Sequence, residues 1–581
     1  MRRFVLTIVG IWSGVALMAA PFYVRINGTR DVAANATGAQ DYQGRTQYAA
    51  PNVEIAAGDK LTCYDAGTGA AWNISVIDPY GAYANFSTGS DALTCNVAGT
   101  YNVYIKMKMN DDMWYIESSN GDTPAPTPYV PGDYDTAVPS ESEDIMLQGF
   151  YWDSNWDKEY GNTRWTTLTG QAAEIGKYFS LVWLPPSSEP KNGGLGYITY
   201  CYSNQNSSLG SEDELRSLLA ALHNRDVRVL ADIVINHCGN DNTWCNFTKL
   251  NFGTYGSFEP NASWLTSDDE GGCNPSGNAD DGQHEANYGA ARDWDHTNTN
   301  VQAMCKAYTR WMKNVMLYDG FRYDYCGGFH VSHINDYNSA AKPYFSVMEY
   351  WYGDASVLKT RIDQAKKNTL IFDFALKYNT FRDGIYKKKY TNCVKGGLRG
   401  KGYAKYAVTF IDNHDTFQRG NDNEVNTEGD GSSINDKSLM MRCNAYLLAM
   451  PGVPCVFYPH WIKYKSEIRK MIEARQLAGI HSESTVEESA TENWYRATVH
   501  GHRGTIRLML GTAAQDEKPA GYTQVVKGTD YAMYVTDQIE QGIESAKRQE
   551  PTANSQKLLR NGQLLILRNG QTYDVMGHLV P

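Results

Sequence analysis

The sequence lacks three features that would place it in other classes of protein. Its eleven cysteines include no C-x-x-C pair, so no zinc site of that spacing is expected. It has no excess of positive charge, because 53 Lys and Arg residues face 65 Asp and Glu residues and the formal net charge is −12. A nucleic-acid partner is therefore not expected. Beyond the N-terminus, no apolar run approaches the roughly 20 residues that span a bilayer.

The N-terminus, MRRFVLTIVGIWSGVALMAAP, has the pattern of a secretory signal. Two arginines precede an apolar run that ends in small residues. Residues 1–20 are therefore predicted to be a signal peptide, and the protein to be secreted or held at the cell surface. Export permits disulfides. The odd number of cysteines leaves at least one thiol free or paired with another chain.

The composition changes along the chain in a way that predicts several segments. Residues 21–118 alternate apolar and polar residues between Gly, Asn and Asp turns, which predicts a β-sandwich. Residues 119–144 are rich in Pro, Ser, Thr and Asp and are predicted to be a linker. Residues 485–537 are predicted to form a C-terminal antiparallel β domain, followed by a tail over 538–581 that ends in a hairpin-like repeat.

Between residues 145 and 484, eight short apolar runs are separated in part by helix-like stretches. The runs are MLQGFYW, FSLVWLP, VRVLADIVIN, GFRYDY, YFSVMEY, TLIFDF, AVTFIDN and PCVFY. Eight buried strands alternating with helices predict an α/β fold, the (β/α)8 TIM barrel, whose active site lies at the carboxyl ends of the strands. One polar excursion, 238–292, follows the third run, and a loop of that length is usually functional or a small subdomain.

Charged residues stand where several of these predicted strands end. Arg322 and Asp324 point to the same side of their strand, because side chains alternate faces along a strand. Glu349 ends the next strand and Asp415 follows the seventh. An isolated Arg-x-Asp pair is more often a structural ion pair than a functional one. Carboxylates at several strand ends of one barrel instead predict a single catalytic site.

Four of these segments, ADIVINH, GFRYDY, MEYW and FIDNHD, resemble the signature segments of the α-amylase family of glycoside hydrolases. LQGFYW, VWLPP, GYITYCY, RDWDHTN and PGVPCVFY are similar to segments of its plant-type members, so the resemblance covers about residues 145–537. It implies a retaining endo-hydrolase of α-1,4-glucosidic bonds in starch and related α-glucans, and the protein is expected to be a monomer. The alternatives are a debranching enzyme or glucan transferase of the same family, or a non-catalytic starch-binding surface protein.

The resemblance assigns roles that the chemistry of retaining glycoside hydrolysis requires. Asp324 would be the nucleophile, Glu349 the general acid, and Asp415 a carboxylate that stabilises the distorted sugar. Arg322 would keep Asp324 ionised and oriented through opposite charge and hydrogen bonding. This would explain why an arginine and an aspartate share one face at the end of an apolar strand.

Three further side chains are expected to bind substrate. By the same resemblance, His237 and His414 would donate hydrogen bonds to sugar hydroxyls, and Tyr197 in GYITY would stack on the ring at the cleavage site. A purely structural role is the alternative for each, above all for Tyr197. Gly327 stands where many relatives have a lysine that touches the leaving-group side of the substrate, so that contact is not carried over.

The resemblance also implies one calcium ion, Ca2+, between the long loop and the barrel. The matching positions are Asn236, Asp293 and the carbonyl of Gly328, hard oxygen donors of the kind that calcium prefers. A further ligand is expected in the loop among Asp280, Asp281, Gln283 and Glu285.

The two ends of the chain have resemblances of their own. The segment 21–118 is similar in style to starch-binding modules that precede bacterial amylases. Its candidate stacking residues are Trp72, Tyr83, Trp114 and Tyr115, with sandwich-core positions as an equal alternative. The terminal KLLRNGQLLILRNGQTYDVMG resembles short C-terminal segments of secreted Bacteroidetes proteins, which implies a sorting or anchoring role for 538–581.

Overall fold

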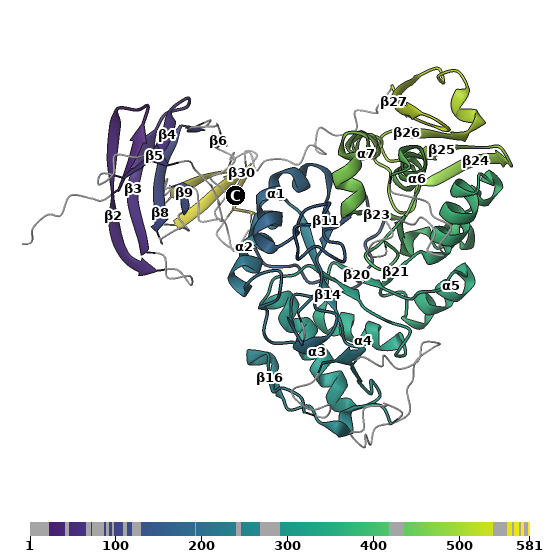
Figure 1. Ribbon diagram of the computed structural model, residues 1–581, viewed down its shortest axis with the longest axis horizontal. Coiled ribbons are helices and arrows are strands. Elements are labelled where there is room, and N and C mark those ends of the chain that lie inside the picture. The colour runs from purple at the N-terminus through teal and green to yellow at the C-terminus, as the bar shows by residue number, and fades with distance from the viewer. Residues whose placement is uncertain are drawn as a thin grey trace, which may run out of the picture.

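The computed structural model places most of the chain (Figure 1). It describes residues 22–40, 46–65, 71–72, 86–88, 92–95, 98–107, 113–118, 129–191, 193–239, 246–267, 291–417, 435–537 and four short strands within 555–580. The predicted signal peptide, Tyr83 and the candidate calcium ligands 280–285 lie outside these ranges, as do the side chains of Trp72, Trp114 and Tyr115. Of the helices that are described, none is long and apolar enough to cross a bilayer.

The N-terminal segment contributes nine antiparallel strands to the described part of the chain. They are β1 (Phe22–Ile26), β2 (Arg30–Gln40), β3 (Thr46–Ile55), β4 (Lys60–Asp65), β5 (Ala71–Trp72), β6 (Phe86–Thr88), β7 (Leu93–Cys95), β8 (Gly99–Met107) and β9 (Met113–Ser118). The first half of β2 pairs with β1 and its second half with β3, so one long strand joins two parts of the sheet. Apolar side chains such as Val24, Leu61 and Val103 form a core that is separate from the core of the barrel.

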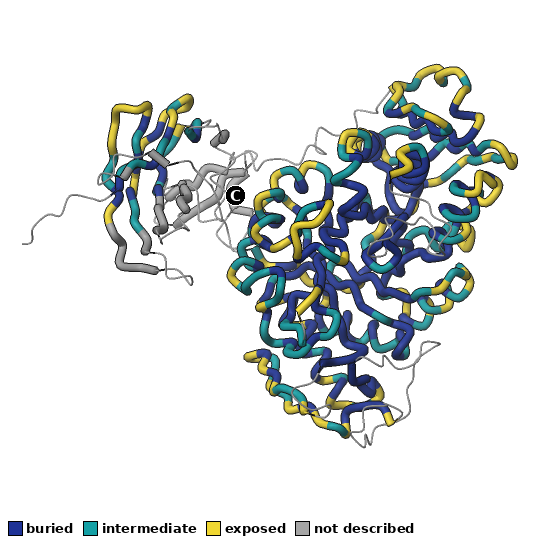
Figure 2. The backbone as a smooth tube through the Cα atoms, viewed as in Figure 1, coloured by how far each residue is buried: buried dark blue, intermediate teal, exposed yellow. Residues whose placement is uncertain are grey.

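Eight parallel strands form a closed barrel, which confirms the predicted fold class. They are β10 (Met146–Gln148), β11 (Leu181–Trp183), β14 (Arg228–Ile233), β19 (Gly320–Tyr323), β20 (Phe345–Met348), β21 (Leu370–Phe372), β22 (Ala407–Phe410) and β23 (Val453–Phe457). Each coincides with one of the eight apolar runs. Figure 2 shows these strands as the most continuously buried part of the molecule, because helices cover their outer faces.

The helices around the barrel are α1 (Trp165–Tyr178), α2 (Glu212–His223), α3 (Thr299–Asn314), α4 (Ser332–Ala341), α5 (Ala355–Gln364), the π-helix η4 (Leu376–Tyr386), α6 (Lys437–Ala449) and α7 (Tyr458–Ala478). Helix α2 begins at a capping box, in which Ser211 accepts from the backbone N–H of Glu214 and the Glu214 side chain accepts from that of Ser211. The apolar residues of α2 recur every three or four positions and face the barrel, since Leu215, Leu218 and Leu222 are buried.

Residues 129–144, here called the strap, pack on the amino-terminal end of the barrel. The ring of Tyr129 stacks on His223 at 3.7 Å, and its hydroxyl donates to Asp319 just before β19. Asp144 accepts hydrogen bonds from Ser180, at 2.6 Å, and Tyr344, at 2.7 Å, which precede β11 and β20. Part of the predicted linker, 119–144, therefore packs on the barrel through residues such as Tyr129 and Asp144.

Two further regions flank the barrel. Residues 485–536 form the expected antiparallel sheet, in the order β24-β25-β26-β28-β27. Its strands are β24 (Thr485–Thr491), β25 (Trp494–His500), β26 (Thr505–Gly511), β27 (Tyr522–Gly528) and β28 (Tyr531–Thr536), and the tail adds β29 (Ser555–Arg560), β30 (Gln563–Arg568), β31 (Gln571–Tyr573) and β32 (Leu579–Val580). Strand β30 pairs antiparallel with β29 at Arg560 and Gln563, the ends of the first R-N-G-Q segment, and with β31 at Arg568 and Gln571, the ends of the second.

Where it is described, the long third loop contains only short elements. These are the strand pairs β15 (His237–Cys238) with β18 (Arg292–Asp293) and β16 (Leu250–Asn251) with β17 (Ser257–Phe258), and the 3-10 turns η2 (Gly253–Tyr255) and η3 (Ala262–Trp264). A similar short pair, β12 (Glu189–Pro190) with β13 (Thr199–Cys201), follows β11 and brings Tyr197 to the barrel mouth. The pairing of β15 with β18 returns the end of the long loop to the barrel beside His237.

Candidate active site

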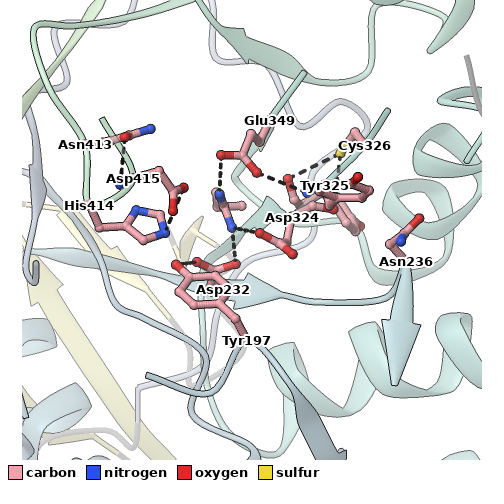
Figure 3. Close-up of polar contacts among 12 residues, drawn as sticks. Tyr197, Asp232, Asn236, Asp324, Tyr325, Cys326, Glu349, Asn413, His414 and Asp415 are labelled. Carbon is pink, nitrogen blue, oxygen red and sulfur yellow. Dashed lines mark hydrogen bonds and ion pairs between the residues drawn. The ribbon is translucent and has the colours of Figure 1, made fainter. Parts of the chain in front are cut away.

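The acidic side chains predicted from strand ends meet at one end of the barrel (Figure 3). Arg322 lies on β19 and Asp324 directly follows it, while Glu349 follows β20 and Asp415 lies on the loop after β22. Strands β14 and β19 are in register at Asp232 and Arg322, so these two side chains are direct neighbours. All of these positions are at the carboxyl ends of the strands, where the fold places catalytic groups.

Arg322 is the centre of the site and is fully buried. One terminal nitrogen, Nη1, lies 2.8 Å from Oδ1 of Asp232 and 2.5 Å from Oδ1 of Asp324. The other, Nη2, lies 2.8 Å from Oε1 of Glu349. The planar guanidinium thus holds three carboxyl groups of three neighbouring strands with two terminal nitrogens in a rigid fork, a geometry that the single nitrogen of a lysine does not offer.

Burial and mutual repulsion shift the ionisation of this cluster. Burial raises the pKa of Asp232 to about 7, with Arg322 opposing the rise. Burial likewise raises the pKa of Asp324 and of Glu349, and again Arg322 opposes it. The pKa of Asp415 lies well above its ordinary value because of burial and the nearby Glu349. One cation cannot balance so many carboxylates, so the cluster favours retaining protons near neutral pH.

Asp324 and Glu349 differ in the effect that each has on the other. Burial raises the pKa of both, but Glu349 opposes the rise at Asp324, whereas the charge of Asp324 adds to the rise at Glu349. Glu349 Oε2 also accepts from the backbone N–H of Tyr325 at 3.1 Å. The pair therefore favours placing a proton on Glu349 rather than on Asp324, while Arg322 contacts both carboxyl groups, at 2.8 Å for Glu349 and 2.5 Å for Asp324.

Both predicted histidines line the cleft, and burial keeps both neutral. Burial lowers the pKa of His237 to about 4, and burial with the charge of Arg322 lowers the pKa of His414 well below its usual value. His414 Nε2 lies 3.3 Å from Asp415, and its Nδ1 lies 3.2 Å from the side-chain amide of Gln148. His237 Nε2 lies 2.9 Å from the carbonyl of Tyr197, so its proton points to the backbone rather than into the cleft.

Aromatic rings form one wall of the cleft. Tyr197 stacks on His414 with ring centres 4.9 Å apart, and Trp152 lies parallel to Tyr197 at 6.0 Å. The hydroxyl of Tyr197 donates to Asp232 Oδ2 at 2.8 Å, which fixes the ring plane. The cleft is lined by Trp152, Tyr197, His237, Asp324, Tyr325, Glu349, Trp351, His414 and Asp415. Flat apolar faces beside carboxylates suit a sugar ring, which is itself apolar on its faces and polar at its edge.

The residues matched to a calcium site also come together. The Nδ2 of Asn236 donates to Asp293 Oδ1 at 2.8 Å, and both residues are buried. A side-chain carbon added to Gly328 would lie 2.1 Å from Asn236 Oδ1, so the turn after β19 comes close to that oxygen only because residue 328 is glycine. Carboxylate, amide and backbone oxygens from the loop, β14 and the turn after β19 are a donor set that fits Ca2+.

A second group with metal-binding spacing, Glu141, His481 and His502, lies away from the cleft. Its nitrogen donors suit transition metals more than calcium. The rings of His481 and His502 stack at 4.1 Å, and Arg503 makes two contacts, of 2.9 and 2.7 Å, with Glu143, which also contacts His502. The nearby guanidinium disfavours a further cation at this position.

The structure adds site residues that the sequence analysis missed. Asp232 contacts both Arg322 and the hydroxyl of Tyr197. The sequence signal for this role was a carboxylate inside the apolar run VRVLADIVIN, because buried carboxylates are rare unless they are paired. Trp152 is about one-third exposed, at 36%, beside Tyr197, and it lies on the loop that follows β10. Gln148 at the end of β10 orients His414.

A barrel with three carboxylates and an arginine at the carboxyl ends of its strands is characteristic of glycoside hydrolases, and sequence comparison identifies the particular family. The model of the alpha amylase catalytic domain matches residues 175–570. The chain belongs to the alpha-amylase family, and the predicted family and enzyme class are confirmed.

Individual relatives agree with this assignment. The chain is 28% identical over 420 residues to "Probable alpha-amylase 2" of Arabidopsis thaliana, covering 68% of this chain and 94% of the relative. It is also 28% identical over 406 residues to a glucan 1,4-alpha-maltotetraohydrolase of Stutzerimonas stutzeri, covering 64% and 68% of the two chains. A solved Anoxybacillus alpha-amylase has the same fold, with a TM-score of 0.51 at 15% identity over 70% of this chain and 100% of that one.

Proposed function

We propose that this protein is a retaining, endo-acting α-amylase that hydrolyses α-1,4-glucosidic bonds in starch or a related α-glucan. The observation that supports this most directly is the asymmetric pair of Asp324 and Glu349 around Arg322. Each group favours in the other the protonation state that its role requires. Both carboxyl groups contact the one guanidinium of Arg322, at 2.5 and 2.8 Å, so they lie close together, which suits a retaining mechanism, since an inverting enzyme holds its pair farther apart to admit a water.

The mechanism follows from these positions. Glu349 donates its proton to the glycosidic oxygen while Asp324 attacks the anomeric carbon, so the leaving chain departs as a neutral alcohol. This step forms a covalent glycosyl-enzyme. Glu349, now ionised, takes a proton from an incoming water, whose oxygen attacks the same carbon and releases Asp324. The two inversions at one carbon retain its configuration.

The other cleft residues bind and orient the sugar in this proposal. Asp415 accepts from hydroxyls of the distorted ring, and His414, held by Gln148, donates to a neighbouring hydroxyl. Tyr197, fixed by Asp232, and Trp152 present ring faces on which glucose can stack. His237 can serve as a hydroxyl donor only if its ring breaks the 2.9 Å contact with the carbonyl of Tyr197.

Analysis of the products separates this function from related activities. Amylose should be cut internally, so its iodine colour should fall well before most reducing ends appear. Pullulan, with its α-1,6 bonds, should be degraded much more slowly than amylose. Rapid debranching of pullulan, or products longer than the substrate, would instead indicate a debranching enzyme or a glucan transferase, and no turnover of any glucan would indicate a binding protein.

We also propose that Ca2+ links the long third loop to the barrel through Asn236, Asp293 and the carbonyl of Gly328. The bound ion would supply fixed positive charge and rigidity beside the active site. Removal of calcium should lower the melting temperature and the activity together, because an ion that binds only the folded chain stabilises it by about 2.7 kcal/mol at 100 times its Kd. Thermal unfolding with excess chelator, with elemental analysis of the protein before and after, measures this effect.

Two variants separate the calcium effect from a general loss of packing. Asn236→Ala should unfold at a lower temperature and lose its response to added calcium. Asn338→Ala removes a buried amide that contacts Tyr323 and the backbone of residue 368 but none of the three candidate ligands, and should keep that response. Wild-type protein that is free of calcium by elemental analysis, yet melts at an unchanged temperature, would contradict the calcium proposal.

The N-terminal sheet is proposed to be a starch-binding module on an exported enzyme. Its core is separate from that of the barrel, which supports independent folding. Deleting residues 21–118 should therefore spare activity on soluble maltooligosaccharides and reduce activity on granular starch, since a second tethered site raises retention on an insoluble polymer. Rates on the two substrates, measured side by side, test the asymmetry.

The strap provides the control for this deletion. Removing residues 21–144 also removes Tyr129 and Asp144 from the base of the barrel, and this longer deletion should lower stability and both activities. Within the module, Trp114→Ala should weaken retardation of the isolated sheet in starch-containing gels. Equal digestion of granules by the 21–118 deletion and the full chain would show that the module does not bind starch.

A further inference from the structure

A buried group of charged side chains lies behind the loop that carries His414 and Asp415. Asp412 is 2% exposed and is not among the residues that line the cleft. Its Oδ1 lies 2.9 Å from Nζ of Lys377, which is fully buried on the π-helix η4. Its Oδ2 lies 3.2 Å from Nε2 of His460, near the start of helix α7. One carboxylate thus connects the end of the seventh strand to the elements that follow the sixth and eighth strands.

The charges in this group favour an ionised Asp412. Burial alone would raise its pKa, but Lys377 and His460 outweigh burial, and the pKa falls to about 2. Lys377 makes a second bond, from Nζ to the carbonyl of Ile411 at 2.8 Å. It therefore holds both the side chain of residue 412 and the backbone just before it. A buried lysine with two oxygen partners has few other orientations available.

The loop beyond Asp412 is tied to itself by short hydrogen bonds. The side-chain oxygen of Asn413 accepts from the backbone N–H of Asp415 at 3.1 Å and of Thr416 at 2.8 Å. The hydroxyl of Thr416 accepts from the N–H of Asn413 at 3.0 Å and lies 3.4 Å from Asp412 Oδ1. These bonds form a compact turn, and Figure 3 shows Asn413, His414 and Asp415 on it beside the catalytic cluster. Any displacement of Asp412 would move the turn as a unit.

We propose that Asp412, with Lys377 and His460, is a positioning residue that fixes where His414 and Asp415 meet the substrate. It touches neither the cleft nor the reacting atoms. This proposal rests on the proposed glucan hydrolysis, because Asp415 and His414 matter to the rate only if they bind the sugar. Its effect would pass through the turn 412–416, so it should appear in substrate binding and turnover and not only in stability.

The test compares Asp412→Asn with a matched buried carboxylate at the other end of the barrel. Asp319, which directly precedes β19, is also 2% exposed. Its carboxylate lies 2.9 Å from His223 Nε2 and 2.8 Å from the backbone nitrogen of Val229. Both Asp412→Asn and Asp319→Asn should lower the melting temperature. At a temperature where both are folded, only Asp412→Asn should lower kcat, by about 10- to 100-fold, as expected for catalytic groups displaced by about 1 Å.

Binding is measured without turnover in a Glu349→Gln background, by calorimetry with maltoheptaose. Adding Asp412→Asn should weaken the Kd about tenfold, as expected from the loss of about 1.4 kcal/mol of binding free energy. Adding Asp319→Asn should leave the Kd unchanged. Wild-type enzyme that cleaves maltoheptaose, with an Asp412→Asn variant of equal kcat and Kd, would overturn the positioning role. Wild-type enzyme that cleaves no glucan would instead overturn the proposed function.

A double variant separates position from stability. Breaking a buried ion pair leaves an unpaired charge, whereas removing both charges relieves that penalty. Lys377→Met with Asp412→Asn should therefore recover melting temperature relative to Asp412→Asn alone. It should not recover kcat, because the bond from residue 377 to the carbonyl of Ile411 is also lost. Recovery of the melting temperature and kcat together would show that Asp412, Lys377 and His460 only stabilise the fold. If Asp412→Asn does not fold, His460→Gln is compared with the wild type by the same two measurements.

Discussion

Replacing Glu349 with Gln should lower kcat on amylose by about 10³-fold, because the amide keeps the shape of the side chain but has no acidic proton to transfer to the leaving oxygen. Binding of maltoheptaose should persist, since the amide oxygen can still accept from the backbone N–H of Tyr325. Initial rates and calorimetry on the same preparation measure both quantities.

A substrate with a different leaving group makes this test specific to the role of Glu349. The fluoride of α-maltosyl fluoride needs much less help from an acid, so Glu349→Gln should keep far more activity on it than on amylose. Asp324→Asn should lose both activities, because the nucleophile is needed in either case. Glu488→Gln, a buried carboxylate paired with Arg399 away from the cleft, is the matched control and should keep both. Near-normal amylose turnover by Glu349→Gln would remove its assignment as the acid.

The second large effect is expected for Arg322→Lys. An ammonium group has one nitrogen in place of the two terminal nitrogens with which Arg322 reaches Asp232, Asp324 and Glu349, so the carboxylates lose their fixed geometry and the rate should fall by at least about 100-fold. Arg322 opposes the burial that raises the pKa of Asp324. Without the guanidinium, that pKa rises further.

The direction of the pH effect follows from the role of Asp324. The nucleophile acts only when ionised, so the acidic limb of the kcat/KM profile reports its deprotonation and should move to higher pH in Arg322→Lys. The control is Arg399→Lys, which makes the same substitution at an arginine that pairs with Glu488. Its kcat/KM profile against pH should match that of the wild type. An acidic limb that stays in place in Arg322→Lys would show that Arg322 does not control the ionisation of the nucleophile.

The sequence predicted the barrel and the charged residues at its mouth because both depend on local signals. Buried strands appear as apolar runs, and residues such as Asp324 and Glu349 stand at their ends, where alternation fixes the side they face. Asp232 was not predicted, since no local pattern shows that a carboxylate inside an apolar run contacts an arginine 90 residues later.

The strap and the group behind Asp415 were missed for the same physical reason. The composition of 119–144 indicates little to bury, yet a few long-range contacts, such as those of Tyr129 and Asp144, hold its second half to the barrel. Lys377 and Asp412 are 35 residues apart, and their pairing depends on how the sixth and seventh strands are neighbours in the closed barrel. Contacts of this kind follow from topology and not from periodicity.

The stereochemistry of the first product tests the central claim most directly. Proton NMR of maltoheptaose mixed with the enzyme, recorded within the first minutes, distinguishes the two anomers of the new reducing end before they interconvert. A double displacement through Asp324 predicts that the α-anomer appears first and that the β-anomer grows later by mutarotation. Initial release of the β-anomer would contradict a nucleophilic Asp324 and the retaining mechanism built on it.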